Sequence, residues 1–358
     1  MELSLCNTLH NWLLEKAMGN RLEYLFEQWF DQKDSCQWVL ATIVETKGSA
    51  YRKAGARMLI NSNGQVFGLL SGGCLESDLM LQAQKCWSLN KDIIIVYDMQ
   101  DETDITWQLG IGCGGMVKVL LQSVNSSNNY LELLTLREKL NNRCVCFYQQ
   151  TPRLDLHEIN KSQNAVKINL DINNNNQLEY ISNDSLIFTS IIKPRPAIAI
   201  MGGGADALPL VNIAYTLGWH ITLFDPRVNY ARRTYFKHAN QIIKKPFNEL
   251  YDCDLLNNAN VIIVMSHNVN LDAQALLVAD KSNASYLGLL GPKHRTLKVL
   301  EKANIEYNQI NKPLFNPVGL NLGGELPESI ALSILSEAHA FLEKKLGNIR
   351  LRELQKIE

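Results

Sequence analysis

Apolar residues change their spacing along the first 123 residues of the chain. Between residues 11 and 30 they recur at steps of three and four, which predicts an amphipathic helix. Apolar and β-branched runs predict strands at Trp38 to Glu45, Ala56 to Ile60, Gln65 to Leu69, Ile93 to Tyr97 and Val117 to Leu121. Asn63-Gly64 predicts a hairpin turn, and the helical spacing returns at or just after Cys74. We therefore predict an α+β domain over residues 1–123.

The stretch that follows is polar and rich in asparagine. It predicts only a helix near residues 130–140 and a strand near 144–149, so we treat residues 124–193 as a connecting region of uncertain fold. Lys193-Pro194-Arg195-Pro196 stiffens the chain and disfavours helix directly before an apolar strand. A domain boundary is therefore predicted at residue 194.

The second half alternates strands with helices. Strands are predicted near Ile242 and at Ala197 to Met201, Ile221 to Phe224, Val261 to Met265 and Tyr286 to Leu290. This alternation is typical of a parallel, doubly wound sheet. We predict an α/β protein with a Rossmann-like domain over residues 194–345 and a C-terminal tail over 346–358.

Composition narrows the class of protein. With 358 residues, 46% hydrophobic residues and a formal charge of -1, the chain is globular and has no broad footprint for nucleic acid or an anionic membrane. The N-terminus lacks the basic start of a secretory signal, and no apolar run approaches the roughly 18 residues of a membrane helix. Eight cysteines without a CxxC pair fit reduced thiols. We expect a cytoplasmic protein.

A glycine motif opens the second domain. Gly202, Gly204 and Ala207 form G-x-G-x-x-A between an apolar strand and a helix, and Asp225 ends the next strand at nearly the expected spacing. In a dinucleotide site, the glycines admit a pyrophosphate and the carboxylate accepts a ribose hydroxyl. This predicts binding of a nucleotide or a phosphorylated pterin, while the alternative is a tight turn with no ligand. Arg227 could favour an extra phosphate or form a surface salt bridge.

Other candidates follow later strands of the same domain. Lys293, His294 and Arg295 open a helix and could hold an anion, although a solvated basic helix start is an equal alternative. His267 follows a strand at a position where α/β enzymes often place a functional group, but a structural role is the alternative.

Two cysteines lie in glycine-flanked loops of the first domain. Cys74 follows Ser71-Gly72-Gly73 and precedes a helix whose dipole favours thiolate, an effect that Glu76 opposes. Cys113 lies between glycines, so a bulky ligand could approach its thiol. Either thiol could be a transient metal ligand, and we expect the two to converge beside a phosphorylated ligand. The alternative is two small residues in tight turns. The other cysteines are interpreted as core residues.

Five segments together resemble the xanthine dehydrogenase accessory factor family, also called XdhC/CoxI. They are Gly48 to Met58, Ser71 to Glu76, Gly110 to Gly115, the glycine loop with Asp225, and Gly319 to Ala331. The chain departs from the family pattern at Tyr51, where proline is usual, at Ala205, where histidine is usual, and at Pro292-Lys293-His294. The missing histidine puts a catalytic or ligand role for position 205 in doubt.

The resemblance implies a maturation factor that binds molybdenum cofactor, assists exchange of its terminal sulfur and delivers it to a xanthine dehydrogenase-like molybdenum hydroxylase. Implied partners are the apo-hydroxylase and a cysteine desulfurase, and a homodimer is the implied assembly. The motifs and the resemblance together give the candidate cofactor-binding residues Arg57, Ser71, Gly72, Gly73, Cys74, Glu76, Cys113, Gly202, Gly204, Ala207, Asp225, Lys293 and Arg295.

Two other functions stay open. The glycine loop with Asp225 fits an NAD(P)-dependent oxidoreductase, and reactive thiols fit a redox sensor. A dehydrogenase needs a general acid or base, for which only His267 and residues 293–295 are available. We therefore favour a cofactor chaperone without turnover of its own.

Overall fold

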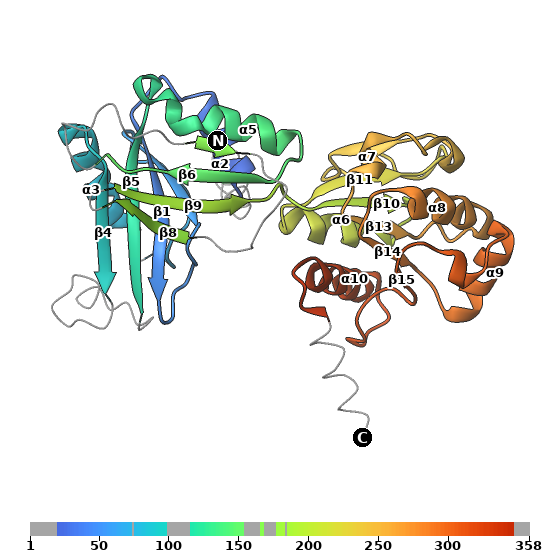
Figure 1. Cartoon of the computed structure of the whole chain (residues 1–358). Helices are drawn as coiled ribbons and strands as arrows, with labels where there is room; N and C mark the ends of the chain where they lie inside the picture. The colour runs from blue at the N-terminus through green and yellow to red at the C-terminus, as the bar shows by residue number, and fades with distance from the viewer. Residues whose placement is uncertain are drawn as a thin grey trace, which may run out of the picture. The chain divides into compact units, whose positions relative to one another are not determined.

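The computed structural model (Figure 1) describes residues 20–73, 75–98, 115–153, 165–167, 177–182 and 185–346. Contacts divide the chain into a first unit, Met1–Pro194, and a second unit, Arg195–Glu358. The division falls inside the Lys193-to-Pro196 segment. In the described part of the chain, no helix has both the length and the apolar character that crossing a bilayer requires.

The first unit is built on a five-stranded antiparallel sheet in the order β3-β2-β1-β5-β4. Its strands are β1 (Trp38–Lys47), β2 (Arg57–Asn61), β3 (Val66–Gly68), β4 (Ile93–Asp98) and β5 (Met116–Val124). The predicted hairpin joins β2 to β3, and Gly64 supplies its positive φ of 80°. Side chains alternate across each strand, so the sheet has two apolar faces to cover.

One face of this sheet packs on α3 (Glu76–Leu89), where Leu79 and Ala83 contact Val39 and Ala41. The other face is covered by a four-stranded antiparallel sheet in the order β7-β6-β9-β8. Figure 1 shows its strands crossing those of the first sheet. Its strands are β6 (Cys146–Gln150), β7 (Ala165–Lys167), β8 (Gln177–Ser182) and β9 (Ser185–Ile192).

Two helices, α2 (Leu22–Phe30) and α5 (Leu133–Asn141), complete the core of this second face. The 3₁₀ segment η1 (Ser126–Glu132) leads into α5. Residues 124–193 therefore contribute α5 and the whole second sheet to the first unit, although the sequence alone predicts only one helix and one strand there.

The second unit contains a six-stranded parallel sheet in the order β12-β11-β10-β13-β14-β15. Counted from the start of the unit this order is 3-2-1-4-5-6, the order of a dinucleotide-binding fold. The strands are β10 (Ala197–Met201), β11 (His220–Phe224), β12 (Gln241–Ile243), β13 (Val261–Val264), β14 (Tyr286–Leu289) and β15 (Leu314–Phe315). The predicted fold class is confirmed.

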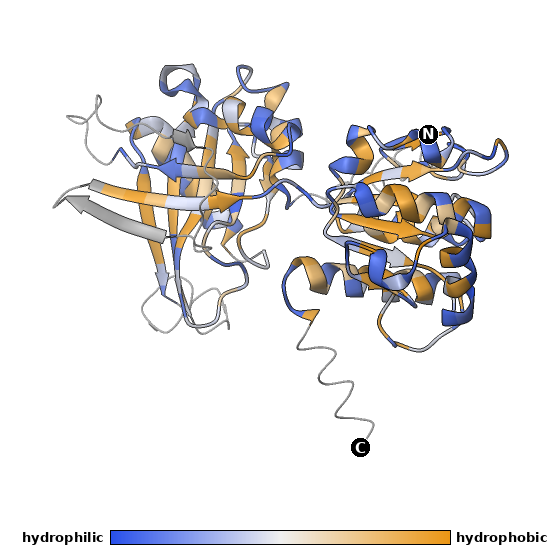
Figure 2. Ribbon diagram, turned by 45° about the vertical axis from the view of Figure 1, so that its right-hand side comes forward, coloured by the Kyte–Doolittle hydropathy of each residue, from blue (hydrophilic) through white to orange (hydrophobic). Residues whose placement is uncertain are grey.

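Helices cover both faces of the parallel sheet. On one face, α6 (Ala207–Thr216) and α10 (Pro327–Leu342) pack against Ile198 and Ile200. On the other, α7 (Asp254–Asn257), α8 (Val269–Lys281) and α9 (Lys293–Ala303) pack against Ala199 and Met201. The remaining elements are short 3₁₀ turns, η3 (Phe247–Glu249) and η4 (Tyr307–Gln309). Figure 2 shows the central strands coloured as hydrophobic, as expected when both faces are buried.

Candidate functional site

The glycine loop forms a tight turn between β10 and α6. Gly202 has a φ of 131°, and a Cβ atom there would lie 2.5 Å from the backbone of Met265. Its N–H donates to the Phe224 carbonyl oxygen over 2.8 Å, and Ala207 is fully buried where α6 begins. A Cβ at Gly204 would meet only the flexible Asp206 side chain, at 2.8 Å. The structure thus brings Gly202, Gly204 and Ala207 together in the predicted turn.

Asp225 is attached to this loop. Its side chain is 0% exposed, and its Oδ2 atom accepts the Gly203 N–H over 2.7 Å. Arg227 donates its backbone N–H and Nε to Oδ1, both over 2.9 Å, and its Nη2 to Oδ2 over 2.7 Å. Burial raises the pKa of Asp225, but the hydrogen bonds from Arg227 and Gly203 outweigh it, so the net pKa lies below the ordinary value.

These bonds use the acceptor capacity of Asp225. A carboxylate offers about four lone-pair sites, and four donor groups of the protein approach this one. A ribose hydroxyl would therefore have to displace Arg227 in order to reach Asp225. The immediate role of the pair is to hold the glycine loop against the end of β11.

His267 and Asp206 form a second pair at this edge. His267 Nε2 lies 2.5 Å from Asp206 Oδ2, and the hydrogen bond that the imidazole donates to this carboxylate raises the pKa of His267. Asp206 lies in the glycine loop, whereas His267 follows β13 with a φ of 59°. The two strands that end here flank the point where the strand order reverses, which is where ligands bind in such folds. Sequence reasoning considered His267 alone and missed Asp206, although Asp206 lies inside the glycine motif.

Arg295 joins the loops that follow β13 and β14. Its Nη2 donates to Asp272 Oδ2 over 2.5 Å, and its Nη1 donates to the Leu290 carbonyl oxygen over 3.2 Å. Asp272 is 0% exposed and also accepts the Ser266 N–H over 3.0 Å. Lys293 is exposed at the start of α9 and makes no hydrogen bond or ion pair with any described residue. Of the two predicted cations, Arg295 is engaged with protein groups and Lys293 is available.

In the first unit, Glu76 closes the loop that carries Cys74. Glu76 Oε1 accepts the Ser71 N–H over 3.0 Å, and Oε2 accepts the Ser71 hydroxyl over 2.5 Å. The Ser71 hydroxyl oxygen in turn accepts the Leu75 N–H over 3.0 Å. Gly72 and Gly73 stay exposed, and a Cβ at Gly73 would meet no atom of the described residues within 4 Å. Cys74 and Cys113 themselves lie outside the described residues.

Three motif segments meet at one end of the first sheet. A Cβ at Gly72 would lie 4.0 Å from the Tyr51 ring, and a Cβ at Gly115 would overlap the Ser49 carbonyl oxygen. Arg52 Nη1 donates to the Leu69 carbonyl oxygen over 3.4 Å. The segment of residues 47–53 therefore contacts both the loop that borders Cys74 and the glycine that follows Cys113 by two positions. Tyr51 is 60% exposed beside it.

Arg57 lies elsewhere, in the interior between the two sheets. It is 5% exposed, and its Nη2 donates to Gln150 Oε1 over 3.1 Å and to Ser190 Oγ over 2.5 Å. Its guanidinium also lies 5.1 Å from the Tyr148 ring centroid. Burial lowers the pKa of Arg57 to about 10, and none of the described carboxylates pairs with it. These contacts connect β2 to the second sheet.

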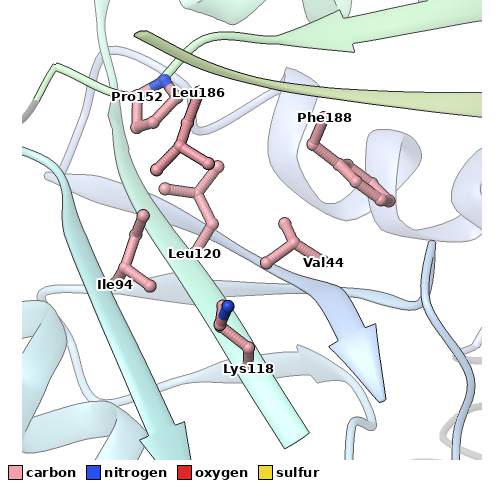
Figure 3. A pocket seen from close by; sticks show the side chains of 7 residues that line it. All are labelled: Val44, Ile94, Lys118, Leu120, Pro152, Leu186 and Phe188. Carbon is pink, nitrogen blue, oxygen red and sulfur yellow. The ribbon is translucent and has the colours of Figure 1, made fainter. Parts of the chain in front are cut away.

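An apolar cavity of about 100 Å³ also lies between the two sheets. Figure 3 shows Val44, Leu120 and Phe188 among its lining side chains, with Lys118 at one side. Lys118 Nζ lies 2.5 Å from Glu45 Oε2. None of the predicted site residues lines this cavity. Within the described residues, no group of three histidine, cysteine or acidic side chains has the spacing of a metal site.

Among the cysteines that the structure describes, Cys86 and Cys146 are buried. Burial raises the pKa of the Cys86 thiol to about 11, which makes it a poor nucleophile. This agrees with the interpretation of these two residues as core. Cys36, Cys144 and Cys253 are partly exposed.

Comparison with known proteins covers both units. Residues 198–338 match the XdhC Rossmann domain, and residues 32–98 match the XdhC and CoxI family. The chain is 29% identical over 341 residues to a probable xanthine dehydrogenase subunit of Bacillus subtilis, covering 89% of this chain and 97% of that protein. It is 22% identical over 301 residues to the molybdenum cofactor insertion chaperone PaoD of Escherichia coli, covering 84% and 81%.

A solved structure extends the similarity to the fold. The crystal structure described as a xanthine dehydrogenase from Bacillus halodurans superimposes with a TM-score of 0.73 at 28% sequence identity. The superposition covers 91% of this chain and 96% of that one. The similarity therefore includes both units rather than the parallel sheet alone.

Proposed function

Because the chain belongs to the XdhC and CoxI family, we propose that it is a maturation factor that binds molybdenum cofactor for a xanthine dehydrogenase-type molybdenum hydroxylase. Two similar proteins support this proposal by their names, one as a cofactor insertion chaperone and one as a probable xanthine dehydrogenase component. In this proposal the protein receives the cofactor, protects it and delivers it, and a separate enzyme carries out the final oxidation chemistry.

The meeting of three motif segments at one end of the first sheet is the observation that carries the proposal. Gly72 approaches Tyr51, and Gly115 packs on Ser49. Cys74 follows Gly72 by two positions along the chain, and Cys113 precedes Gly115 by two positions. Successive Cα atoms are about 3.8 Å apart, so covalent geometry restricts how far either thiol can lie from this shared segment. We infer that both thiols serve one ligand site.

The residues that border this site suit the cofactor. Open space beside Gly73 leaves room for a bulky group next to Cys74. The adjoining helix α3 begins at Glu76, so its positive end favours thiolate at Cys74. The carboxylate of Glu76 opposes this effect, while both of its oxygens accept hydrogen bonds from Ser71. Thiolates are soft ligands that suit a metal or sulfur-bearing cofactor.

Delivery requires partners. We propose that the apo-hydroxylase receives the cofactor and that a cysteine desulfurase supplies the terminal sulfur while the cofactor is held. We also propose a homodimer as the working assembly. Co-purification of the full chain with each candidate partner tests the two interactions. The mass of the full chain in solution tests the homodimer.

Anaerobic titration of the full chain with purified molybdenum cofactor tests the binding proposal. We expect saturable binding that Cys74→Ala and Cys113→Ala together weaken by at least about tenfold, which is the loss of roughly one strong contact. Cys253→Ala is the matched control, because this partly exposed cysteine belongs to the second unit. No binding would reject the proposed function, and binding unchanged in the double variant would reject the thiol site.

An NAD(P)-dependent oxidoreductase is the second candidate, supported by the 3-2-1-4-5-6 strand order and the glycine loop. Its acid or base would be His267, which is paired with Asp206. Steady oxidation of NADPH or NADH with an added acceptor, lost in His267→Gln, would support it over the chaperone.

A further inference from the structure

A basic segment lies beside the glycine loop, in a chain whose overall charge is -1. Residues 226–248 contain six lysines and arginines and no aspartate or glutamate. The six are Arg227, Arg232, Arg233, Lys237, Lys244 and Lys245. The segment runs from the end of β11 through the parallel strand β12, so both of its ends lie at the carboxyl edge of the sheet. A local excess of positive charge at this position attracts anions.

The two acids that flank this segment, Asp225 and Glu249, carry fewer charges than its six cations. Asp225 directly precedes it, but its single charge is buried and already paired with Arg227. The Arg227 guanidinium is fixed by that pair and lies 3.5 Å from the Tyr230 ring centroid. Its Nη1 atom donates to no described residue, and the side chain is 26% exposed. One guanidinium edge is therefore held in place and available to a ligand.

Two more cations lie near Arg227. Lys244 Nζ donates to the carbonyl oxygens of Tyr230 and of Arg227, the latter over 3.3 Å. Arg232 Nη2 donates to Asn229 Oδ1 over 2.8 Å. Among the described residues, neither cation has a carboxylate partner. Burial lowers the pKa of Lys244, the negative charge of Asp225 opposes this, and the positive charges of Arg232 and Arg227 lower the pKa again, so Lys244 lies within electrostatic range of both arginines.

This cluster is attached to the glycine loop. The Ala231 N–H donates to the Gly203 carbonyl oxygen over 3.0 Å, and a Cβ at Gly203 would lie 2.5 Å from the Ala231 Cβ. The Gly203 N–H in turn donates to Asp225. In dinucleotide-binding folds, the end of this strand reads the ribose: a free carboxylate selects a diol, and a nearby arginine accommodates a phosphate. Here the carboxylate is occupied and the arginine is available.

From these contacts we infer that Arg227, Arg232 and Lys244 form a recognition site for a phosphate monoester on a ligand held along the glycine loop. The same chemistry has two sources, the 2′-phosphate of an adenine dinucleotide and the phosphate of a phosphorylated pterin. The pterin source rests on the proposed function, whereas the dinucleotide source does not. A guanidinium that a buried carboxylate holds in place is suited to bind a small, doubly charged group such as a phosphate. It is less suited to bind the mobile surface of a protein partner.

Calorimetric titration of the full chain tests this site with ligands matched except for one phosphate. The first pair is NADP⁺ and NAD⁺, and the second is adenosine 2′,5′-bisphosphate and adenosine 5′-monophosphate. We expect the phosphorylated member of each pair to bind at least about tenfold more tightly, the effect of about one charge-assisted contact. Arg232→Ala and Lys244→Ala should remove this preference. Both side chains are exposed and free of ion pairs with described residues, so these variants should fold.

Lys237→Ala is the control, because this exposed lysine belongs to the same segment but not to the cluster. If neither dinucleotide binds, a third titration uses purified molybdenum cofactor. Weakened binding in Arg232→Ala and Lys244→Ala, but not in Lys237→Ala, would then identify the pterin phosphate as the source. This outcome can be distinguished from the effect of the double variant Cys74→Ala and Cys113→Ala, because that variant removes the two thiols and leaves Arg227, Arg232 and Lys244 unchanged.

Three results would overturn the inference. One is equal affinity for both members of each nucleotide pair, and another is molybdenum cofactor binding that neither cluster variant changes. The third is binding of polyglutamate that is lost in the cluster variants while nucleotides and cofactor are unaffected, since this would assign the segment to an acidic protein partner. The proposed maturation function would survive the first two.

Discussion

The two units hold their motif loops in different ways. In the second unit, Gly202 packs within 2.5 Å of backbone, and carboxylates that are 0% exposed fix the neighbouring loops. In the first unit, a Cβ at Gly73 would meet none of the described atoms within 4 Å, and Glu76 closes the loop by accepting two hydrogen bonds from Ser71. The loop of the second unit is packed into its core at Gly202, whereas Gly72 and Gly73 of the first unit present exposed backbone. Substitutions should therefore lower stability in the second unit and ligand binding in the first.

Asp272→Ala should give the largest effect. It leaves the Arg295 guanidinium unpaired and removes the acceptor of the Ser266 N–H. Removing one partner of a buried ion pair costs about 3–5 kcal/mol of the free energy of unfolding. Calorimetric unfolding should show this loss in the transition of the second unit. Asp252→Ala, at an exposed position, is the control and should change stability by less than about 0.5 kcal/mol. If Asp272→Ala and Asp252→Ala lowered the free energy of unfolding by similar amounts, the buried ion pair would not be what holds these loops.

Gly202→Ala should cost about 3 kcal/mol, because the new methyl group meets the Met265 backbone and the φ of 131° is strained for alanine. Urea unfolding measures this change. Gly64→Ala is a useful control, because its φ is also positive but nothing lies within 4 Å of the added atom. Equal losses at the two positions would mean that conformation alone, and not packing, decides the cost.

Gly73→Ala should cost only about 1 kcal/mol of stability, since the backbone strain of its φ of 110° is not joined by a clash. The same variant should weaken binding of molybdenum cofactor by about tenfold, because the methyl group occupies the open space beside Cys74. Unfolding and anaerobic titration on one sample separate the two effects. A stability loss as large as that of Gly202→Ala, with binding intact, would reverse our assignment of the two loops.

The smallest effect is expected from the pair of His267 and Asp206. The hydrogen bond that His267 donates to Asp206 raises the pKa of His267, so its contribution to stability is full below the unfolded pKa of about 6.5 and is lost as the pH rises through the folded pKa. Asp206→Asn should lower the pKa of His267 toward its ordinary value, which an NMR titration of the ring proton measures. The His267 side chain is 60% exposed, so the change in stability itself should be small. An unchanged pKa would show that the pair does not form.

Local patterns predicted most elements because the relevant signal is local. A run of apolar and β-branched residues located β1, and helical spacing located α3, each within a few residues, while the Asn63-Gly64 turn fixed the β2–β3 hairpin. The glycine motif likewise located the turn before α6. Local patterns could not predict that β6 pairs with β9, because the paired residues lie far apart in the chain.

The charged contacts of the candidate site were harder to predict for the same reason. Asp206 and His267 are 61 residues apart in the chain and meet only because β10 and β13 are neighbours in the sheet. For Arg227 the sequence offered a surface salt bridge as one alternative. In the structure its partner is Asp225, which is fully buried because β12 and the glycine loop pack around it. Arg57 begins β2, whose next three residues are apolar, and only the second sheet explains why its charge faces the interior.

The central claim is that the thiols of Cys74 and Cys113 serve a single site, and bridging by an arsenical tests it most directly. Phenylarsine oxide joins two thiols only when they are close, so anaerobic treatment followed by peptide mapping reports their proximity. We predict one arsenic atom that joins the peptides of Cys74 and Cys113, and protection from this reaction by prior addition of molybdenum cofactor. Separate, unbridged peptides, or bridging that the cofactor does not affect, would contradict the account.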